Sequence, residues 1–276
     1  MRESMRKKHI GSIRVSLLLF LSAVILTLGC GHRADSPEDV PGQEMTDIFG
    51  MESQPAEEQP VEGKQSSPEI AVAPLLIFED PETENLAGML QEESGGMMVQ
   101  LAAGRFMGSG ILYKTEEEQL IILTAGHVLE DAGETVQITF FDGWEYTSPD
   151  FEVFESSDLA VVRIPLEQIP TDRLATYCLA NVDKESYDRT VSEDGCIVMG
   201  SRSGVAEDAY EGYILEPWIY MEDYGQYMMW VDAAGKPGMS GGGLFDRRGH
   251  LLGILSGRSE DGQWAVVPLA LVLAVV

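Results

Sequence analysis

The sequence predicts an all-β protein built from two six-stranded antiparallel barrels, preceded by a long amino-terminal segment that does not fold alone. Two observations favour the barrels. From residue 97 onward, short apolar runs alternate with Gly, Asp and Glu turns, which is the spacing of strands joined by tight turns. Long helical periodicity is missing from this part, apart from a short terminal helix expected around 269–275.

Residues 1–29 have the layout of a secretory signal. A basic start precedes an apolar run from residue 15 to residue 28, which is short for a membrane span. Cys30 follows Leu-Thr-Leu-Gly, an arrangement that resembles a bacterial lipobox, so we expect cleavage before Cys30 and lipidation of its thiol. An uncleaved amino-terminal anchor is the alternative. Both interpretations place the rest of the chain outside the cytoplasm.

Residues 30–95 are expected to form an acidic, disordered tether. They hold sixteen Asp and Glu against two basic residues and carry few large apolar side chains. Such a composition cannot bury enough surface to offset the entropy of ordering. One short apolar patch, residues 70–78, is a candidate to dock on the folded domain.

Charge and composition exclude several classes of partner. The formal net charge of −28 would repel phosphate backbones and anionic membrane surfaces, so nucleic acid is not an expected partner. The four histidines are scattered and the cysteines have no paired spacing, so we expect neither a metal nor another cofactor. Cys178 and Cys196 can form a disulfide or remain buried thiols.

The folded part is expected over 96–276, with one barrel at about 96–170 and the other at about 171–276. The first group of expected strands covers 97–101, 106–113, 120–124, 136–141, 151–154 and 159–164. The second group covers 196–199, 213–215, 228–231, 243–245, 251–255 and 264–267.

A glycine-rich segment, residues 235–243, surrounds a single serine, Ser240. A serine hydroxyl attacks a carbonyl only when a base takes its proton, and unobstructed backbone N–H groups must meet the oxyanion that develops. We therefore interpret Ser240 as a nucleophile, with the N–H groups of Gly238 and Ser240 as the oxyanion hole. The alternative is a glycine-rich turn in which the serine is incidental.

Two further segments can supply the base and its partner. His127 follows a buried strand that ends in small residues, a position that would hold a general base rigidly. Asp158 opens the apolar strand at 159–164, where an unpaired charge would be costly. Taken alone, each residue has an ordinary alternative, as a packed histidine and a turn aspartate.

The three segments together resemble the trypsin-like (chymotrypsin-fold) serine proteases, most closely the HtrA or Do-type bacterial branch. The matching stretches are TAGHV, SSDLAVVRI and DAAGKPGMSGGGLFD, and the resemblance extends over about 96–276. It implies an active site between two barrels, with His127 as general base, Asp158 as its stabilising partner and Ser240 as the nucleophile of an acyl-enzyme mechanism.

The sequence also departs from that family. The chain ends about 36 residues after Ser240, so no PDZ domain is expected. Met239 stands where digestive relatives have an aspartate that pairs with a newly cut amino terminus, so activation by that salt bridge is not expected.

By the same resemblance, Ala234, Ser256 and Gly257 are expected at the primary specificity pocket. Without a carboxylate there, small or medium apolar residues are expected before the scissile bond. Arg258 raises the alternative of an acidic preference, if its guanidinium folds into the pocket.

The predicted function is an extracytoplasmic, membrane-tethered serine endopeptidase that cleaves extended or unfolded polypeptides. Its expected partners are polypeptide substrates and, through the lipid on Cys30, a membrane. An α/β-hydrolase esterase is a weaker alternative, because its histidine would have to be His250, in a predicted turn, and alternating helices are missing. A protease-fold binding module without catalytic activity is the other alternative.

Overall fold

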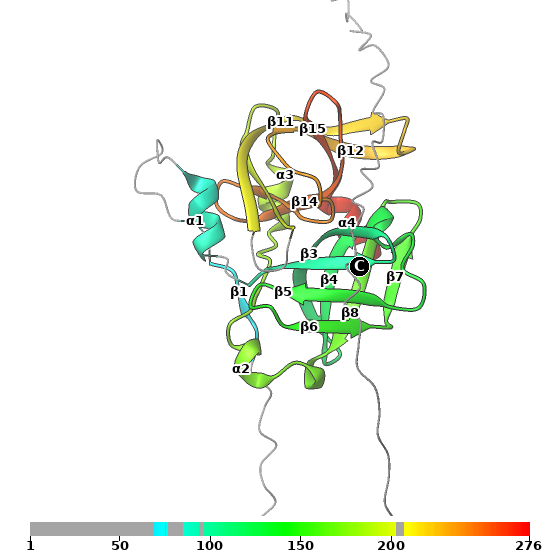
Figure 1. The fold of residues 1–276 in the computed structure, drawn as a ribbon. Helices are drawn as coiled ribbons and strands as arrows, with labels where there is room; N and C mark the ends of the chain where they lie inside the picture. The colour runs from blue at the N-terminus through cyan, green and yellow to red at the C-terminus, as the bar shows by residue number, and fades with distance from the viewer. Residues whose placement is uncertain (1–68, 75, 77–84, 94–95, 203–206) are drawn as a thin grey trace, which may run out of the picture. The chain divides into compact units, whose positions relative to one another are not determined.

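The computed structural model describes residues 69–74, 76, 85–93, 96–202 and 207–276 (Figure 1). The predicted signal at 1–29, the predicted lipidation site Cys30 and most of the predicted tether lie outside these residues. Within the described ranges, no helix has the length and apolar character needed to cross a bilayer.

A seven-stranded antiparallel sheet, here called the first sheet, forms the amino-terminal half of the folded part. Its strand order is β6-β5-β2-β3-β4-β8-β7. The strands are β2 (Met98–Ala103), β3 (Phe106–Glu116), β4 (Gln119–Ala125), β5 (Val136–Phe140), β6 (Glu145–Ser148), β7 (Phe151–Phe154) and β8 (Leu159–Pro165). The sequence predicted six strands here and missed β6, because that strand is short and mostly polar and lacks an apolar run.

Two neighbouring strands of the first sheet bring His127 and Asp158 to the same edge. β4 and β8 are almost wholly buried, which explains their continuous apolar sequences. Their antiparallel register pairs Ala125, the last residue of β4, with Leu159, the first residue of β8. The residues just after β4 and just before β8 therefore emerge side by side, and these include His127 and Asp158.

A closed six-stranded barrel, here called the second barrel, forms the carboxyl-terminal half, as predicted. Its strand order is β10-β11-β12-β15-β14-β13. The strands are β10 (Gly195–Ser201), β11 (Glu207–Met221), β12 (Gln226–Ala233), β13 (Gly243–Asp246), β14 (Leu251–Arg258) and β15 (Gln263–Pro268). The terminal helix α4 (Leu269–Val275) has the predicted bounds. Ser240 lies in the loop between β12 and β13.

Short elements complete the described fold. They are β9 (Cys178–Leu179), the helices α2 (Thr171–Leu174) and α3 (Lys184–Asp188), and the single-turn helices η1 (Gly126–Leu129) and η2 (Leu166–Gln168). Cys178 and Cys196 are separate buried thiols, so the two do not form a disulfide in this structure. Burial, followed by the nearby charges of Asp194 and Asp232, raises the pKa of the Cys196 thiol to about 12.

Part of the segment expected to be a tether packs on the folded part. β1 (Ala71–Val72) pairs in parallel with β9, and α1 (Leu86–Glu93) lies beside β11 (Figure 1). Leu76, Leu86 and Leu90 are all buried. These described residues lie ahead of position 96 and are held to the folded part by apolar burial, and the boundary itself stays a prediction.

Candidate active site

His127 and Asp158 form a hydrogen-bonded pair at the edge of the first sheet. His127 lies in η1 directly after β4, and its Nδ1 is 3.1 Å from both carboxylate oxygens of Asp158. The backbone N–H of His127 also donates to Asp158 Oδ1, at 2.9 Å. The two side chains are only 22% and 19% exposed, so this contact is largely shielded from water. A carboxylate in this position favours the tautomer with a proton on Nδ1, which leaves Nε2 free to act as a base.

Local backbone geometry explains how the carboxylate reaches the ring. Asp158 has φ of +45°, a left-handed conformation that aspartate tolerates better than most residues, in the turn between β7 and β8. Gly126 lets the aspartate come close, because a Cβ at this position would lie 3.2 Å from both the carbonyl carbon and Oδ1 of Asp158. The small residue before His127 therefore leaves room for the contact that orients the histidine.

Ser256 is a third member of this group. It is fully buried in β14 of the second barrel, and its hydroxyl donates a hydrogen bond to Asp158 Oδ2. Burial by itself raises the pKa of Asp158, but the hydrogen bonds and charge interaction with His127, together with the Ser256 hydroxyl, outweigh burial and lower that pKa. Ser256 was expected to line the specificity pocket, whereas its side chain contacts Asp158. In the sequence, this serine directly follows the mostly apolar run at 251–255.

The segment that carries Ser240 packs directly against the strands that carry the His127 pair. The carbonyl of Ser240 accepts from the N–H of Ser109 on β3 at 2.7 Å, and the N–H of Gly241 donates to Leu255 O on β14 at 2.7 Å. Gly241 has φ of +85°, and a side chain there would overlap Ser109 O and the hydroxyl of Thr124 on β4. The glycine after Ser240 is therefore needed for this close approach.

The loop segment before Ser240 combines a glycine in a left-handed backbone conformation with a buried methionine. Gly238 has φ of +92°, which any residue with a side chain rarely adopts. Met239 is fully buried in the second barrel and anchors the loop. Within the described part of the chain, the N–H groups of Gly238 and Ser240 donate to no protein acceptor. Both N–H groups are therefore available to a ligand oxygen.

The structure brings the predicted nucleophile and base into neighbouring segments without a hydrogen bond between their side chains. Gly108 lies between the two, since a Cβ there would be 2.8 Å from Ser240 O and 2.6 Å from Val128, the residue after His127. Among the described residues, the imidazole of His127 bonds only to Asp158. Catalytic hydrogen bonds of this kind are often long before substrate binds.

The other predicted pocket residues lie around Trp264. Ala234 is exposed, and its carbonyl accepts from the Trp264 indole N–H at 3.4 Å. Gly257 is buried in β14, where the pairing with β15 shifts register between Leu255 and Arg258. The guanidinium of Arg258 lies 5.8 Å from the centre of the Trp264 ring, and its Nε donates to Gly262 O at 3.0 Å. Arg258 is thus engaged at the β14–β15 turn.

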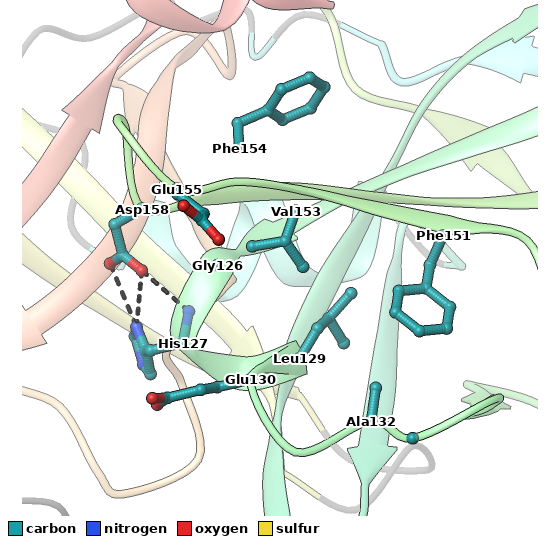
Figure 2. A pocket seen from close by; sticks show the side chains of 11 residues that line it. Gly126, His127, Leu129, Glu130, Ala132, Phe151, Val153, Phe154, Glu155 and Asp158 are labelled. Carbon is teal, nitrogen blue, oxygen red and sulfur yellow. Dashed lines mark hydrogen bonds and ion pairs between the residues drawn. The ribbon is translucent and has the colours of Figure 1, made fainter.

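A cavity of about 590 Å³ opens beside His127 and was not predicted from the sequence (Figure 2). Its lining comes from η1 and the following turn, and from β7 and the turn before Asp158. Figure 2 shows Glu130 and Glu155 on the side of the His127 pair, with Phe151 and Ala132 on the opposite side. Both glutamates are exposed, and neither forms an ion pair with any described residue. The cavity therefore combines an apolar wall with two uncompensated carboxylates.

His250 and the sheet topology bear on the α/β-hydrolase alternative. His250 is 6% exposed, and its Nδ1 lies 2.8 Å from Asp246 Oδ2 in the turn between β13 and β14. The described fold has no parallel sheet flanked by alternating helices. Both facts argue against the α/β-hydrolase alternative.

Comparison with known proteins identifies the family of this fold. A family model described as a trypsin-like peptidase domain matches residues 108–254. The chain is 29% identical over 136 residues to the probable periplasmic serine endoprotease DegP-like of Chlamydia trachomatis, which covers 48% of this chain and 25% of that protein. It is 28% identical over 163 residues to the serine protease Do-like HtrA of Bacillus subtilis, covering 56% of this chain and 34% of that protein. The chain thus spans less than half the length of these two relatives.

A solved structure supports the same fold. The HtrA-type protease AlgW with decapeptide superposes with a TM-score of 0.54 at 21% identity, covering 67% of this chain and 64% of that one. The closed barrel and the curled first sheet correspond to the two-barrel architecture of these proteases.

Proposed function

The chain belongs to the trypsin-like peptidase family, and we propose that it is a serine endopeptidase with a catalytic triad of His127, Asp158 and Ser240. The observation that carries the proposal is the buried contact of 3.1 Å between His127 Nδ1 and Asp158, beside a loop with a serine and two free N–H groups. These features support the assignment of a base, an orienting acid, a nucleophile and an oxyanion site to neighbouring segments.

In the proposed reaction, His127 Nε2 takes the proton from the Ser240 hydroxyl as its oxygen attacks the carbonyl carbon of the scissile peptide bond. The N–H groups of Gly238 and Ser240 donate hydrogen bonds to the oxyanion that forms. Asp158 stabilises the imidazolium, which gives its proton to the leaving amine as the C–N bond breaks and a Ser240 ester remains. Water, deprotonated by His127, then attacks this ester; His127 returns the proton to Ser240 Oγ as the ester C–O bond breaks, and the carboxylic acid product leaves.

A fluorophosphonate probe tests this assignment. The probe should label the chain, and Ser240→Ala should abolish labelling together with peptide hydrolysis. His127→Ala should remove nearly all activity, and the double variant should lose little more, because both groups act in one step. His250→Gln is the matched control, since that imidazole also contacts a carboxylate but lies away from the loop. Peptide hydrolysis by Ser240→Ala would refute the assignment, and a correctly folded but inactive wild-type protein would favour the binding-module alternative.

We further propose that the residue before the scissile bond is small or medium in size and apolar. Ala234 offers no carboxylate to a cationic side chain, whose burial without a partner is costly. The Trp264 indole, 2% exposed and bonded to Ala234 O, supports a shallow pocket. The engagement of Arg258 with Gly262 O and Trp264 argues against an acidic preference. Profiling with a peptide library tests this, and dominant cleavage after Lys, Arg or Glu would contradict it.

The cavity beside His127 is proposed to take a second substrate side chain, one with an apolar stem and a cationic end. Its apolar wall suits the stem, and Glu130 and Glu155 suit the charge. The Glu130→Gln, Glu155→Gln double variant should reduce kcat/KM for substrates with Lys or Arg near the scissile bond and leave neutral substrates unchanged. Glu167→Gln is the matched control on η2, outside the cavity lining. Equal effects on both kinds of substrate would contradict this role.

The location of the enzyme is also a proposal. The signal at 1–29 and the lipobox-like sequence before Cys30 support export and a lipid anchor, with an acidic linker ahead of the protease domain. The relative from Chlamydia trachomatis is named as periplasmic, which agrees with export. Cys30→Ser should release the protein from membranes or stall its processing. A mature chain that begins elsewhere and carries no acyl group, as measured by mass spectrometry, would contradict the anchor.

Substrates are proposed to be extended or unfolded polypeptides that add a strand at the site. The register shift in β14 between Leu255 and Arg258 supports this, because it frees backbone groups of Ser256 and Gly257 from full pairing with β15. The AlgW structure, which contains a decapeptide, supports a polypeptide as the class of substrate. An unfolded protein should therefore be cleaved much faster than the same protein in its folded state, and equal rates would contradict the proposal.

A further inference from the structure

Ser109 on β3 has an unusual number of contacts with the opposite half of the fold. It is fully buried, and no charge lies in its hydrogen-bond network. Its hydroxyl oxygen lies 2.8 Å from Gly238 O and 3.3 Å from Ser201 O, and it accepts from the N–H of Ser201 at 2.9 Å. Its backbone N–H donates to Ser240 O at 2.7 Å. One residue of the first sheet therefore contacts β10 and both flanks of the nucleophile loop.

The single hydroxyl proton of Ser109 has a preferred acceptor. A serine hydroxyl has one donor and can accept as well. Because the Ser201 N–H already occupies a lone pair of the oxygen, the proton is directed to one of the two carbonyls. The distance from the Ser109 hydroxyl oxygen to Gly238 O is 2.8 Å, which is closer to the usual length of such a hydrogen bond than the 3.3 Å to Ser201 O. The hydroxyl therefore holds the carbonyl of Gly238.

The two carbonyls that Ser109 holds lie on either side of the Ser240 N–H and just after the Gly238 N–H. Fixing Gly238 O sets the peptide plane that follows Gly238, and fixing Ser240 O sets the plane that follows Ser240. The plane between them carries the Ser240 N–H, and its Met239 carbonyl accepts from Gly242 N at 2.9 Å. Each plane from Gly238 to Gly241 thus has its carbonyl engaged. The Ser240 N–H lies in the middle one of these planes, and the Gly238 N–H lies in the plane just before them; neither donates to an acceptor among the described residues.

Ser109 is itself fixed from the strand that carries the base. The Thr124 hydroxyl on β4 donates to Ser109 O at 2.7 Å, and β4 ends at Ala125, two residues before His127. The chain of contacts therefore runs from the strand of the base, through Ser109, to the loop of the nucleophile.

We propose that Ser109 is a positioning residue that holds the oxyanion loop in its donor-ready conformation through the hydrogen bond from its hydroxyl to Gly238 O. The inference rests on the proposed function, because it assigns a role within that same site. Ser109 does not touch the substrate. Its effect is expected on the step that develops negative charge, and not on ground-state binding.

The test compares Ser109→Ala with Ser201→Ala in the full chain. Ser201 is the matched control, because its hydroxyl is equally buried and close by but has no hydrogen-bond partner among the described residues. Ser109→Ala should lower kcat by about 10- to 100-fold and change KM by less than about twofold, as expected when oxyanion donors are misplaced. The rate of fluorophosphonate labelling should fall by a similar factor. Ser201→Ala should keep kcat and the labelling rate near wild type.

Rates are expressed per folded molecule, with the folded fraction measured by near-ultraviolet circular dichroism. A wild-type kcat per folded molecule in Ser109→Ala would overturn the inference. If Ser109→Ala does not fold, Thr124→Val is tested in its place, because valine keeps the side-chain volume and removes the donor to Ser109 O. Thr124→Val should then lower kcat several-fold, and a wild-type kcat in that variant would overturn the inference. Activity retained by Ser240→Ala would instead overturn the proposed function.

Discussion

The hydroxyl of Ser256 can be removed to test how the carboxylate of Asp158 is held. Asp158 is 19% exposed at its side chain and has three donors: the backbone N–H and Nδ1 of His127, and the Ser256 hydroxyl. A hydrogen bond to a charged group contributes about 1.5–3 kcal/mol. At about 1.4 kcal/mol per tenfold change in rate, losing the whole amount in the transition state would slow the reaction about 10- to 150-fold. We therefore expect Ser256→Ala to lower kcat within this range, and less than His127→Ala does.

The same substitution has a defined effect on the pH dependence of stability. The pKa of Asp158 is lowered in the folded state, because the bonds from His127 and Ser256 outweigh the burial that raises it. A lowered carboxylate pKa adds stability that is present above the unfolded value of about 3.9 and is lost as the pH falls through the folded value. Removing the Ser256 hydroxyl raises the folded pKa of Asp158 toward the unfolded value. Acid unfolding should therefore begin at a higher pH in Ser256→Ala.

The assay combines peptide hydrolysis at neutral pH with urea unfolding from pH 2 to pH 7. Ser157→Ala is the matched control, since Ser157 is adjacent to Asp158 and buried, but its hydroxyl donates to Phe154 O at 3.2 Å. Ser157→Ala should lower the free energy of unfolding by the same amount at every pH and leave kcat nearly unchanged. Wild-type kcat in Ser256→Ala, together with an unshifted acid limb, would refute the role given to Ser256.

Three further outcomes are expected. Gly241→Ala should abolish peptidase activity, because φ is +85° there and a methyl group would overlap Ser109 O; measurable kcat would contradict the close approach. Leu90→Ala should lower the free energy of unfolding in urea by about 2–5 kcal/mol, as for other fully buried leucines, while the control Leu273→Ala, at a side chain 40% exposed, should change it by less than about 0.5 kcal/mol. Cys196, with a pKa raised to about 12, should resist alkylation at pH 8 until the protein unfolds, as peptide mapping would report.

Much of the fold could be predicted because its strands carry strong local signals. β4 and β8 are buried along nearly their whole length and appear in the sequence as continuous apolar runs. The bounds of α4 follow from Pro268 before it and from its apolar residues. β6 had no such signal, since a short polar strand at the end of a sheet depends on its neighbour β5 for its hydrogen bonds.

The predicted triad residues share a second kind of local signal, small residues beside a chemically special one. Ala125 and Gly126 precede His127, and glycines surround Ser240, because close backbone approach requires them. The roles of Ser109 and Ser256 could not be predicted in this way. Their hydroxyls bond to Gly238 and Asp158, which are 129 and 98 positions away in the chain. Only the tertiary fold shows which partner a buried serine has.

The loop between β12 and β13, residues 234–242, is held mainly by burial and by neutral hydrogen bonds. Lys236 in the loop contacts Asp208 at 2.6 Å, but its side chain is 46% exposed, and such ion pairs contribute about 0–1 kcal/mol. Complete burial of Met239 contributes about 1.5–3 kcal/mol. An aspartate at this position would need a cationic partner to be buried, whereas methionine needs none. The geometry of this loop is therefore expected to depend little on ionic strength.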